Sequence, residues 1–548
     1  MPYSVVKALD GRIDVRQPTM VAFEGPASTT FQQVTPPDQT VLNPLFALTV
    51  ATGMGVNRCM MLTVSGQTTI TGTSINLFAT QQCIALRAWP IHQMMSNLQM
   101  QINDGTLAIS PNLYINALAM VGNTNEEQGG IQSSTATAPD LVCGYSSVVG
   151  TVASPFANGL DMNQSPNASV RTAQITNVVY NGTTSAIVYW TVSEPLILSP
   201  FSYSSDTKKS FFGVSTLNIT INYNNTQRCI CYATPAGATV SAVSTAFTAQ
   251  SLQISLVAPT ESALTLIPRS ILYDYSSIQM IPTTAGGTLS ANGGSLQVSS
   301  NSIELSVIPS KFIIFACPAF SDTNSVSSCI PDFFFPISNV SCQYGLKSGL
   351  LSGASQPQLW DISRRNGVNA SYNRWAGSPV WDSASQAAIY GSAPLVLDVA
   401  ADLGLDTSLS PAMNVRTQFV INCTITNQSS VSYTNARFIV LAVIPGVVEL
   451  NGGTTLVKLG GITESDLHSA RVLDYVADSA VQADKSNAGY AGGMKIKGLH
   501  SRPIHVAKSH SPHRSHSPHS HSPRSHSPAR GGAKMRGSVR HNLSSSMY

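Results

Sequence analysis

Residues 217–223 read Leu-Asn-Ile-Thr-Ile-Asn-Tyr, so that apolar side chains alternate with Asn and Thr. Residues 419–425 read Phe-Val-Ile-Asn-Cys-Thr-Ile and follow a similar alternation. Successive side chains of a β-strand point to opposite faces of its sheet, so this pattern predicts strands with one face in a core. Further strand-like runs occur at residues 60–65, 98–102, 170–180, 186–193, 253–257, 303–308, 312–316 and 438–444.

These runs predict an all-β protein, because no helical periodicity lies between them. A sandwich of eight strands with insertions needs roughly 180 to 220 residues. The chain before about residue 450 therefore fits two tandem antiparallel jelly-roll sandwiches, with a boundary near Pro259 and Pro268. The predicted divisions are an N-terminal arm at 1–57, a first jelly roll at 58–260, a second jelly roll at 261–450, a helical segment at 451–490 and a tail at 491–548.

One amphipathic helix is predicted after the second sandwich, from about Glu464 to Ala483. Thr463 and Asp466 form a start that resembles a capping box. The apolar stripe of this helix consists of Leu467, Ala470, Leu473, Ala477 and Val481. Two long polar loops, at residues 121–168 and 367–392, are expected to decorate the outer surface.

Charged residues are scarce in this chain. Only 10% of its 548 residues are charged, against roughly 25% in typical soluble proteins. A chain of this size with so few charges is expected to cover much of its surface with copies of itself or a partner. The composition therefore indicates a subunit of an assembly.

The nine cysteines are scattered and lie mostly in apolar runs such as residues 312–317. This placement favours buried free thiols in a reduced compartment over a disulfide framework. The first residues lack an apolar stretch, so a secretory signal is not expected. No apolar run approaches the roughly 20 residues that a membrane-spanning helix needs.

The C-terminal tail differs sharply in charge from the rest of the chain. Of 30 Lys and Arg and 27 Asp and Glu, ten basic residues and no acidic ones fall in 491–548. The tail therefore carries +10, and the remaining 20 basic and 27 acidic residues give −7. Ser-His-Ser-Pro occurs four times, starting at residues 509, 515, 520 and 525. Such a sequence cannot build a core and is expected to be disordered in isolation.

The spacing of the tail's basic residues is suited to contacts with a phosphate backbone without recognition of bases. The candidate nucleic-acid-binding residues are Lys495, Lys497, Arg502, Lys508, Arg514, Arg524, Arg530, Lys534, Arg536 and Arg540. A solvated extension, or loose metal binding by the tail's nine histidines, are the alternatives. Four serines precede proline and are candidate phosphorylation sites: Ser511, Ser517, Ser522 and Ser527.

Motifs of catalysis are absent from the sequence: there is no phosphate-binding glycine loop, no His-Glu-x-x-His and no paired Cys-x-x-Cys. We therefore predict no catalytic residue, no metal site and no cofactor. Outside the tail only His92 and His468 could serve as a histidine base, and His92 is expected to be structural. Cys229 and Cys231 are expected on one strand as Cys-x-Cys, pointing the same way, but they lack a second ligand pair for a metal.

Four tryptophans could in principle form a platform for bases or sugars. They are Trp89, Trp190, Trp360 and Trp375, in strand or turn contexts in different parts of the chain. We expect them to pack in the core or at subunit interfaces.

Several apolar segments resemble those of the major capsid proteins of adintoviruses and Polinton-like elements. The segment 196–201, Leu-Ile-Leu-Ser-Pro-Phe, with 213–219 resembles the end of their first jelly roll. Residues 267–279 and 308–315 resemble the opening strands of the second. The resemblance continues in order through residues 337–340, 347–352, 365–367 and 397–411.

In that family, which is similar in architecture to the adenovirus hexon, each chain folds as two jelly rolls and three chains form a pseudo-hexagonal capsomer. The resemblance implies a non-enzymatic major capsid protein, located in the virion, that forms an icosahedral shell, with a separate penton protein as a further partner. The basic tail departs from the hexon pattern, and basic arms of this kind are commoner in capsids with a single jelly roll.

Two rival interpretations remain open from the sequence. The first is a capsid protein with one jelly-roll shell domain and a projecting β domain, from a small virus with a single-stranded genome. The second is a secreted β-rich adhesin or carbohydrate-binding protein. The lack of a signal peptide and the basic tail both count against the second.

Overall fold

The structure is a computed structural model of the chain. It describes residues 4–8, 19–23, 28–81, 84–87, 89–121, 173–199, 210–232, 234–259, 270–305, 307–324, 329, 332–345, 347–377, 380–382, 387–389, 392–405, 417–428, 431–451 and 453–459. The predicted helix at 464–483, almost all of the predicted loop at 121–168, and the basic tail lie outside the described residues.

The first half of the chain forms two antiparallel sheets around one hydrophobic core. One sheet runs in the order β10-β11-β6-β15-β5-β12, and β3 also pairs with β15. Its strands are β3 (Ser28–Val34), β5 (Gly55–Asn57), β6 (Met61–Thr73), β10 (Ala173–Asn181), β11 (Ser185–Pro195), β12 (Ser210–Phe211) and β15 (Thr239–Ala258). The other sheet has the order β4-β13-β8-β9. Its strands are β4 (Leu45–Thr49), β8 (Met95–Ile102), β9 (Gly105–Ile109) and β13 (Thr216–Tyr223).

The second half repeats this plan with two five-stranded antiparallel sheets. One has the order β16-β28-β20-β25, with β29 paired to β28. Its strands are β16 (Ser270–Thr284), β20 (Lys311–Cys317), β25 (Leu395–Asp398), β28 (Arg437–Asn451) and β29 (Thr454–Leu459). The other has the order β18-β26-β21-β22, with β19 paired to β26. Its strands are β18 (Gly294–Ser299), β19 (Ile303–Leu305), β21 (Ile337–Tyr344), β22 (Lys347–Leu350) and β26 (Thr417–Asn427).

Small elements complete the described chain. The helices are α1 (Leu77–Gln81), α2 (Pro90–Met94), α3 (Ile115–Ala119), α6 (Phe320–Thr323), α7 (Gln356–Arg365) and α8 (Tyr372–Trp375), with 3₁₀ turns η1 (Pro111–Leu113) and η3 (Thr226–Cys229). Four short strand pairs are β1 (Ser4–Ala8) with β2 (Thr19–Phe23), β7 (Ile84–Leu86) with β14 (Ile230–Tyr232), β17 (Thr288–Leu289) with β27 (Tyr433–Thr434), and β23 (Val380–Asp382) with β24 (Ala387–Ile389). None of the helices in the described part of the chain is long and apolar enough to cross a membrane.

The apolar side chains that alternate in the sequence point into the two cores. In β13, Leu217, Ile219 and Ile221 are buried, and the polar residues between them are only partly covered. In β26, Phe419, Ile421, Cys423 and Ile425 are buried in the second core. The predicted all-β fold of two tandem sandwiches is confirmed. Each predicted strand run overlaps an observed strand, although β6, β15 and β28 extend well beyond the predicted runs at 60–65, 253–257 and 438–444.

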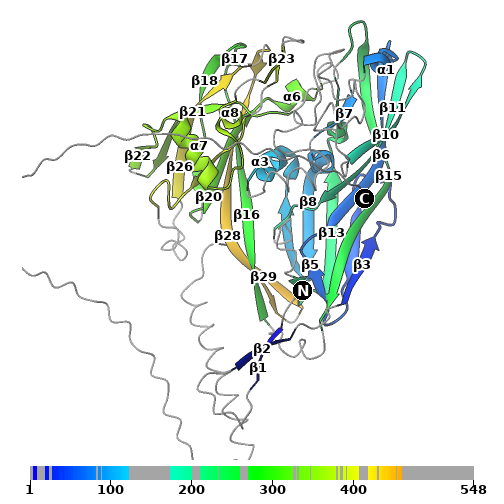
Figure 1. The fold of residues 1–548 in the computed structure, drawn as a ribbon, viewed down its shortest axis with the longest axis vertical. Helices are drawn as coiled ribbons and strands as arrows, with labels where there is room; N and C mark the ends of the chain where they lie inside the picture. Colours follow the sequence, from blue (N-terminus) through cyan, green and yellow to red (C-terminus); the bar gives the residue numbers. More distant parts are fainter. Residues whose placement is uncertain are drawn as a thin grey trace, which may run out of the picture. The chain divides into compact units, whose positions relative to one another are not determined.

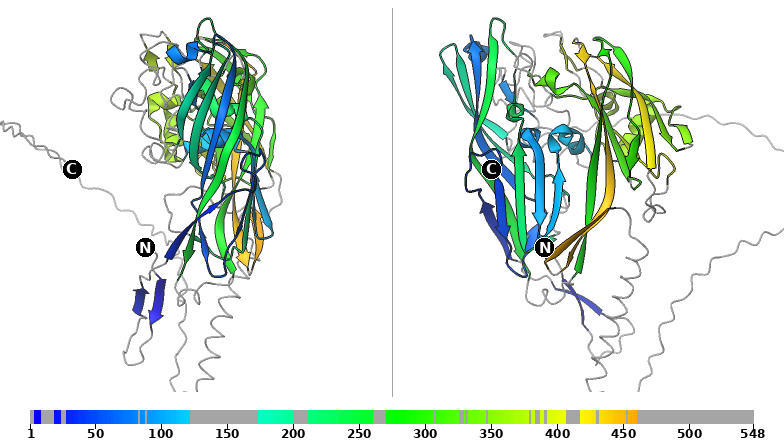
Figure 2. Two further views of the ribbon diagram at one scale, coloured as in Figure 1. Left: turned by 90° about the vertical axis from the view of Figure 1, so that its right-hand side faces the viewer. Right: turned by 180° about the vertical axis from the view of Figure 1, so that it is seen from behind.

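The long strands β16 and β28 run side by side along their whole length (Figure 1), from the pair Ser270–Asn451 to the pair Thr284–Arg437. Although they belong to a sheet of the second sandwich, Tyr273, Val448 and Leu450 pack into the core of the first sandwich. This strand pair therefore contributes to both cores. Figure 2 shows the long strands β6, β11 and β15 of the first sandwich, which pair with one another in the order β11-β6-β15, from two further sides.

The residues assigned from the sequence to an N-terminal arm, 1–57, include three strands of the first sandwich. β3 and β5 pair with β15, and β4 pairs with β13. We propose on this basis that the first jelly roll begins near Ser28 rather than at residue 58.

Helices were missed between the strands. The sequence predicted no helical periodicity before residue 450, yet α7 occupies Gln356–Arg365. Its buried stripe consists only of Leu359, Ile362 and Ser363, which is too short for a periodicity signal. A local sequence signal for this helix does exist, because Ser355 and Gln358 have the Ser-x-x-Gln spacing of a capping box. In the structure, the side chain of Gln358 accepts a hydrogen bond from the Ser355 backbone N–H at 2.8 Å.

The prediction that residues 367–392 form a loop on the outer surface is wrong for residues 367–377. Val368 and Trp375 are both 1% exposed and belong to the second core. Trp375 lies in α8 and Trp360 in α7, so the strand or turn context expected for these two tryptophans is also wrong.

Candidate functional site

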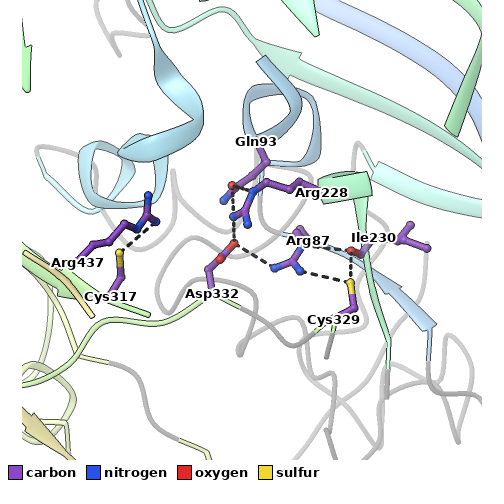
Figure 3. Close-up of polar contacts among 8 residues, drawn as sticks. All are labelled: Arg87, Gln93, Arg228, Ile230, Cys317, Cys329, Asp332 and Arg437. Atoms are coloured by element: carbon purple, nitrogen blue, oxygen red, sulfur yellow. Dashed lines mark hydrogen bonds and ion pairs between the residues drawn. The ribbon is translucent and has the colours of Figure 1, made fainter. Parts of the chain in front are cut away.

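Two groups of polar contacts join the first sandwich to the second, and we describe them as the candidate functional site. The first group is the arginine latch, which consists of Arg87, Gln93, Arg228 and Asp332 (Figure 3). Arg87 follows β7, Gln93 lies in α2 and Arg228 lies in η3, so all three belong to the first sandwich. Asp332 precedes β21 of the second sandwich.

Both arginines of the latch contact one oxygen of Asp332. Arg228 Nη2 lies 2.5 Å and Arg87 Nη1 lies 3.2 Å from Oδ2. The guanidinium groups are almost fully buried, at 0% and 1% exposed, and the Asp332 side chain is 14% exposed. Arg228 also donates from Nη2 to Gln93 Oε1 at 2.6 Å, which ties the ion pair to α2.

The electrostatics of Asp332 follow from this arrangement. Burial by itself would raise the pKa of its carboxyl group, but Arg228, Arg87 and Arg437 outweigh burial and hold that pKa below its ordinary value. Arg228 and Arg437 further stack on the same ring, since their Cζ atoms lie 4.2 and 3.8 Å from the centroid of Phe320. The latch therefore concentrates positive charge around a single carboxylate.

Backbone and thiol contacts reinforce the arginine latch. Arg87 Nε donates to the Ile230 carbonyl at 3.1 Å, and Tyr232 N–H donates to the Cys329 carbonyl at 2.9 Å. Arg437 lies on β28, where its Nη2 contacts Cys317 Sγ at 3.4 Å (Figure 3). Burial raises the pKa of the Cys317 thiol, so this sulfur stays protonated near neutral pH.

Helix α2 is itself fixed by a buried acid. The Glu194 carboxylate accepts hydrogen bonds from the backbone N–H groups of Ile91 and His92, both at 3.2 Å, and lies 2.6 Å from His92 Nδ1. His92 and Glu194 are both 0% exposed. The expectation that His92 is a structural residue is therefore confirmed, and its role is to hold the helix that carries Gln93.

The second group of contacts, the asparagine latch, joins the β8–β9 turn to β29 and consists of Asn103, Asp104 and Thr455. The backbone N–H of Thr455 donates to Asp104 Oδ1 at 2.6 Å, and Asn103 Nδ2 donates to Thr455 Oγ1 at 3.3 Å. Gly105 lies so close to Thr455 that a Cβ atom there would come within 2.7 Å of Thr455 Cγ2. Elsewhere on this boundary, the Tyr273 hydroxyl accepts a hydrogen bond from Phe212 N–H at 2.7 Å.

Asn103 also orders the first sandwich around this latch. Its Oδ1 accepts hydrogen bonds from Ser215 N–H and Ser215 Oγ–H, both at 2.8 Å, and from Thr216 N–H at 3.2 Å. Its backbone has φ +52°, a left-handed conformation that asparagine tolerates better than most residues. One side chain thus connects β8, the start of β13 and β29.

The residues singled out from the sequence fall into two groups. All ten candidate nucleic-acid-binding residues and all four candidate phosphorylation sites lie outside the described residues. Trp89, Trp190 and Trp375 are at most 1% exposed and Trp360 packs partly against the second core, which confirms their core packing.

No disulfide bond joins the seven cysteines of the described chain. Six of the seven are buried, as the sequence predicted. Cys231 lies in β14, but Cys229 lies in η3 rather than in a strand. Among the described residues no group of three or more His, Cys, Asp or Glu side chains is arranged to hold a metal ion.

Sequence reasoning missed every residue of both latches. A signal was present, because Arg87 follows the apolar run 84–86 and Asp332 precedes the three phenylalanines 333–335. A charge inside an apolar run indicates a buried ion pair. The partner could not be identified, because Arg87 and Asp332 are 245 positions apart in the sequence.

Comparisons with known proteins agree with this architecture. The family model described as the Sputnik virophage major capsid protein first domain matches residues 2–267. The model described as the major capsid protein V20 C-terminal domain matches residues 280–446. Capsid protein V20 of Sputnik virophage is 22% identical over 465 residues, which cover 81% of this chain and 76% of that protein.

Two solved structures share the fold. The cryo-EM structure of the Sputnik virophage superimposes with a TM-score of 0.68 and 20% identity, covering 85% of this chain and 95% of that chain. The crystal structure of the mavirus major capsid protein gives a TM-score of 0.60 and 15% identity, covering 80% and 92%.

Two antiparallel sandwiches in tandem, joined through a shared strand pair and two polar latches, form a double jelly roll, the fold that this chain shares with these two structures. With both halves matched by the virophage family models, the chain is a viral major capsid protein of the virophage type and a component of the virion capsid. The prediction of a double-jelly-roll major capsid protein is confirmed. The alternative of one jelly roll with a different projecting domain is wrong, because the second half is itself a capsid jelly roll.

Proposed function

We propose that this chain is a non-enzymatic building block that associates as trimers and that these trimers form an icosahedral shell, with a separate penton protein as a further partner. The observation that carries this proposal is the match of both jelly rolls to virophage capsid domains. The low charged fraction, 10% of residues, supports extensive contact between copies. Each contact needs only modest affinity, because several neighbours hold every subunit at once.

Light scattering of the purified full chain tests the trimer. We expect a species of three times the 57.9 kDa chain mass, or a larger closed shell. Negative-stain images should show trimeric capsomers or shells. A monodisperse monomer at micromolar concentration and neutral pH would contradict this proposal.

We propose further that the tail holds the packaged genome by electrostatic attraction. The support is its composition, with ten Lys and Arg and no acidic residue over 491–548. Counterion release from the phosphate backbone provides the driving force, and no base needs to be recognised. Phosphorylation of the four Ser-Pro sites would add about −1.5 to −2 charges per site and nearly cancel the +10.

Truncation of residues 491–548 tests the tail. The ratio of absorbance at 260 and 280 nm of purified particles should fall, while particle geometry is expected to stay the same because a sequence of this composition is not expected to build a core. The matched control keeps the length and the Ser-His-Ser-Pro repeats but replaces the ten basic residues by glutamine. Equal nucleic acid in the wild type and in the glutamine variant would exclude the tail as the packaging element.

A further inference from the structure

The part of the β16–β28–β29 sheet where all three strands pair, residues 270–275, 446–451 and 454–459, has apolar residues on both of its faces. One face is covered by the first sandwich, where Tyr273, Val448 and Leu450 are at most 8% exposed. On the other face, Leu272 is 61% and Leu456 is 53% exposed. Strands with two apolar faces are typical of sheets that are covered on both sides. Within the described residues, the second face is not covered.

The strand register places the two exposed leucines in one row. Leu272 pairs with Glu449, and Glu449 pairs with Leu456, so the three side chains share a face. Glu449 Oε2 lies 3.5 Å from Nζ of Lys458, which stands on the same face of β29 one step along. Because these two charges neutralise each other, the leucine row can be buried without leaving a net charge in the contact.

Strand β3 offers a second exposed surface. Residues 28–33 are all exposed, and Phe31, at 84%, is the most exposed large apolar side chain of the described chain. The strand reads Ser-Thr-Thr-Phe-Gln-Gln-Val and has no charge and no proline. In the described residues it pairs along one edge only, with β15. Natural edge strands are usually protected by charges, proline or bulges, and β3 has no charge or proline.

We propose that in the trimer the Phe31 face of β3 in one copy packs against the leucine row of β16, β28 and β29 in the next copy. This inference rests on the trimer proposed above and assigns the surfaces that form it. Two different apolar surfaces on one chain permit a head-to-tail contact, and such a contact closes into a ring when the rotation between copies allows it. Strand β3 carries no charge, and the charges of Glu449 and Lys458 beside the leucine row neutralise each other, so the contact would leave no net charge buried.

Two variants each remove one side of the contact. Phe31→Asp alters β3, and the double variant Leu272→Asp with Leu456→Asp alters the leucine row. We expect each to dissociate the trimer, with the dissociation constant of each contact raised about 30-fold or more. Sedimentation velocity over a concentration series measures this. Val431→Asp is the matched control, because Val431 is also an exposed apolar residue, at 56%, but belongs to neither surface.

Mixing the two variants distinguishes this contact from others. The Phe31→Asp chain keeps its leucine row and the double variant keeps Phe31, so a 1:1 mixture contains one intact contact per pair. We expect a heterodimer that cannot close into a ring. A mixture that stays monomeric, while each variant alone is also monomeric, would contradict the head-to-tail pairing of these two surfaces.

The remaining outcomes separate this inference from the trimer proposal. If the wild-type chain and both variants are trimers, the contact is wrong and the trimer stands. If the variants lower the melting temperature but stay trimeric, the chain's own residues cover these faces, and the contact is again overturned. A monomeric wild type would overturn the trimer and this contact together.

Discussion

The two latches between the sandwiches perform the same task with different chemistry. The arginine latch buries charge, with Arg87 and Arg228 at no more than 1% exposed around Asp332. The asparagine latch uses neutral or backbone donors at a partly exposed turn, where Asp104 and Asn103 contact Thr455. Water can replace a lost partner at the second latch but not at the first. A buried ion pair therefore makes the boundary between the domains sensitive to single substitutions, whereas an exposed turn makes it tolerant.

The largest effect is expected for Asp332→Ala. The substitution leaves Arg87 and Arg228 buried without their shared carboxylate, and breaking a buried pair in this way costs about 3–5 kcal/mol. Urea unfolding of the full chain measures the loss. The control is Asp361→Ala in α7, where the pairs with Arg364 and Arg365 are exposed and worth roughly 0–1 kcal/mol. Similar losses in the two variants would remove the distinction between buried and exposed contacts.

Acidification should also weaken the arginine latch, with a smaller loss of stability than the Asp332→Ala substitution causes. Since the folded-state pKa of Asp332 is held below its ordinary value of 3.8, the ionised carboxylate stabilises the fold fully above the unfolded pKa. That contribution is lost as the pH falls from about 4 through the lower folded-state pKa. Melting temperatures between pH 5 and pH 2.5 should therefore fall more steeply for the wild type than for Asp332→Asn. Parallel curves would show that another carboxyl group controls acid stability.

At the exposed latch, Asn103→Ala should cost less, about 1–3 kcal/mol. The loss combines several hydrogen bonds, each worth about 1 kcal/mol net, with the strain of φ +52° for alanine. Asn103→Gly is the informative companion, because glycine removes the side chain but accepts this backbone conformation. We expect the glycine variant to be the more stable of the two. Equal stability of the two variants would show that backbone strain contributes little.

The sequence allowed the strands to be predicted because their signal is local. Burial on one face of a sheet forces the alternation of residues 217–223 and 419–425, and any short window contains it. The latches depend on residues far apart, as in the pair of Arg228 and Asp332, which are 104 positions apart. To pair such residues, one must already know the strand register within each sandwich and how the two sandwiches pack together. Spacing along the sequence supplies neither, so the candidate site could not be derived from it.

The long strand β16 shows a related limit, in which the local pattern itself is missing. Residues 271–273, Ile-Leu-Tyr, carry no alternation because the strand has apolar residues on both faces, and β16 is therefore not among the strand runs predicted from alternation. The reason for these adjacent apolar residues is visible only in the structure, where Tyr273 packs in the first core and Leu272 lies outside it. For this strand, contact with more than one layer is the physical reason that the sequence pattern fails.

The smallest effect is expected from Gly105→Ala, which adds one methyl group at the exposed latch. The new Cβ would lie 2.7 Å from Thr455 Cγ2 and 2.9 Å from Thr455 Cβ, so Thr455 or the turn that carries residue 105 must shift. Overpacking costs about 1–3 kcal/mol in a tight core, and we expect about 1 kcal/mol here because β29 is an edge strand that can shift. Thr455→Ser removes Cγ2 and keeps the hydroxyl that accepts from Asn103, so the double variant should recover part of the loss. A double-mutant cycle in urea measures this coupling. If the two costs simply add, Gly105 and Thr455 do not restrain each other, and the close approach of the two sandwiches at this turn contributes nothing to stability.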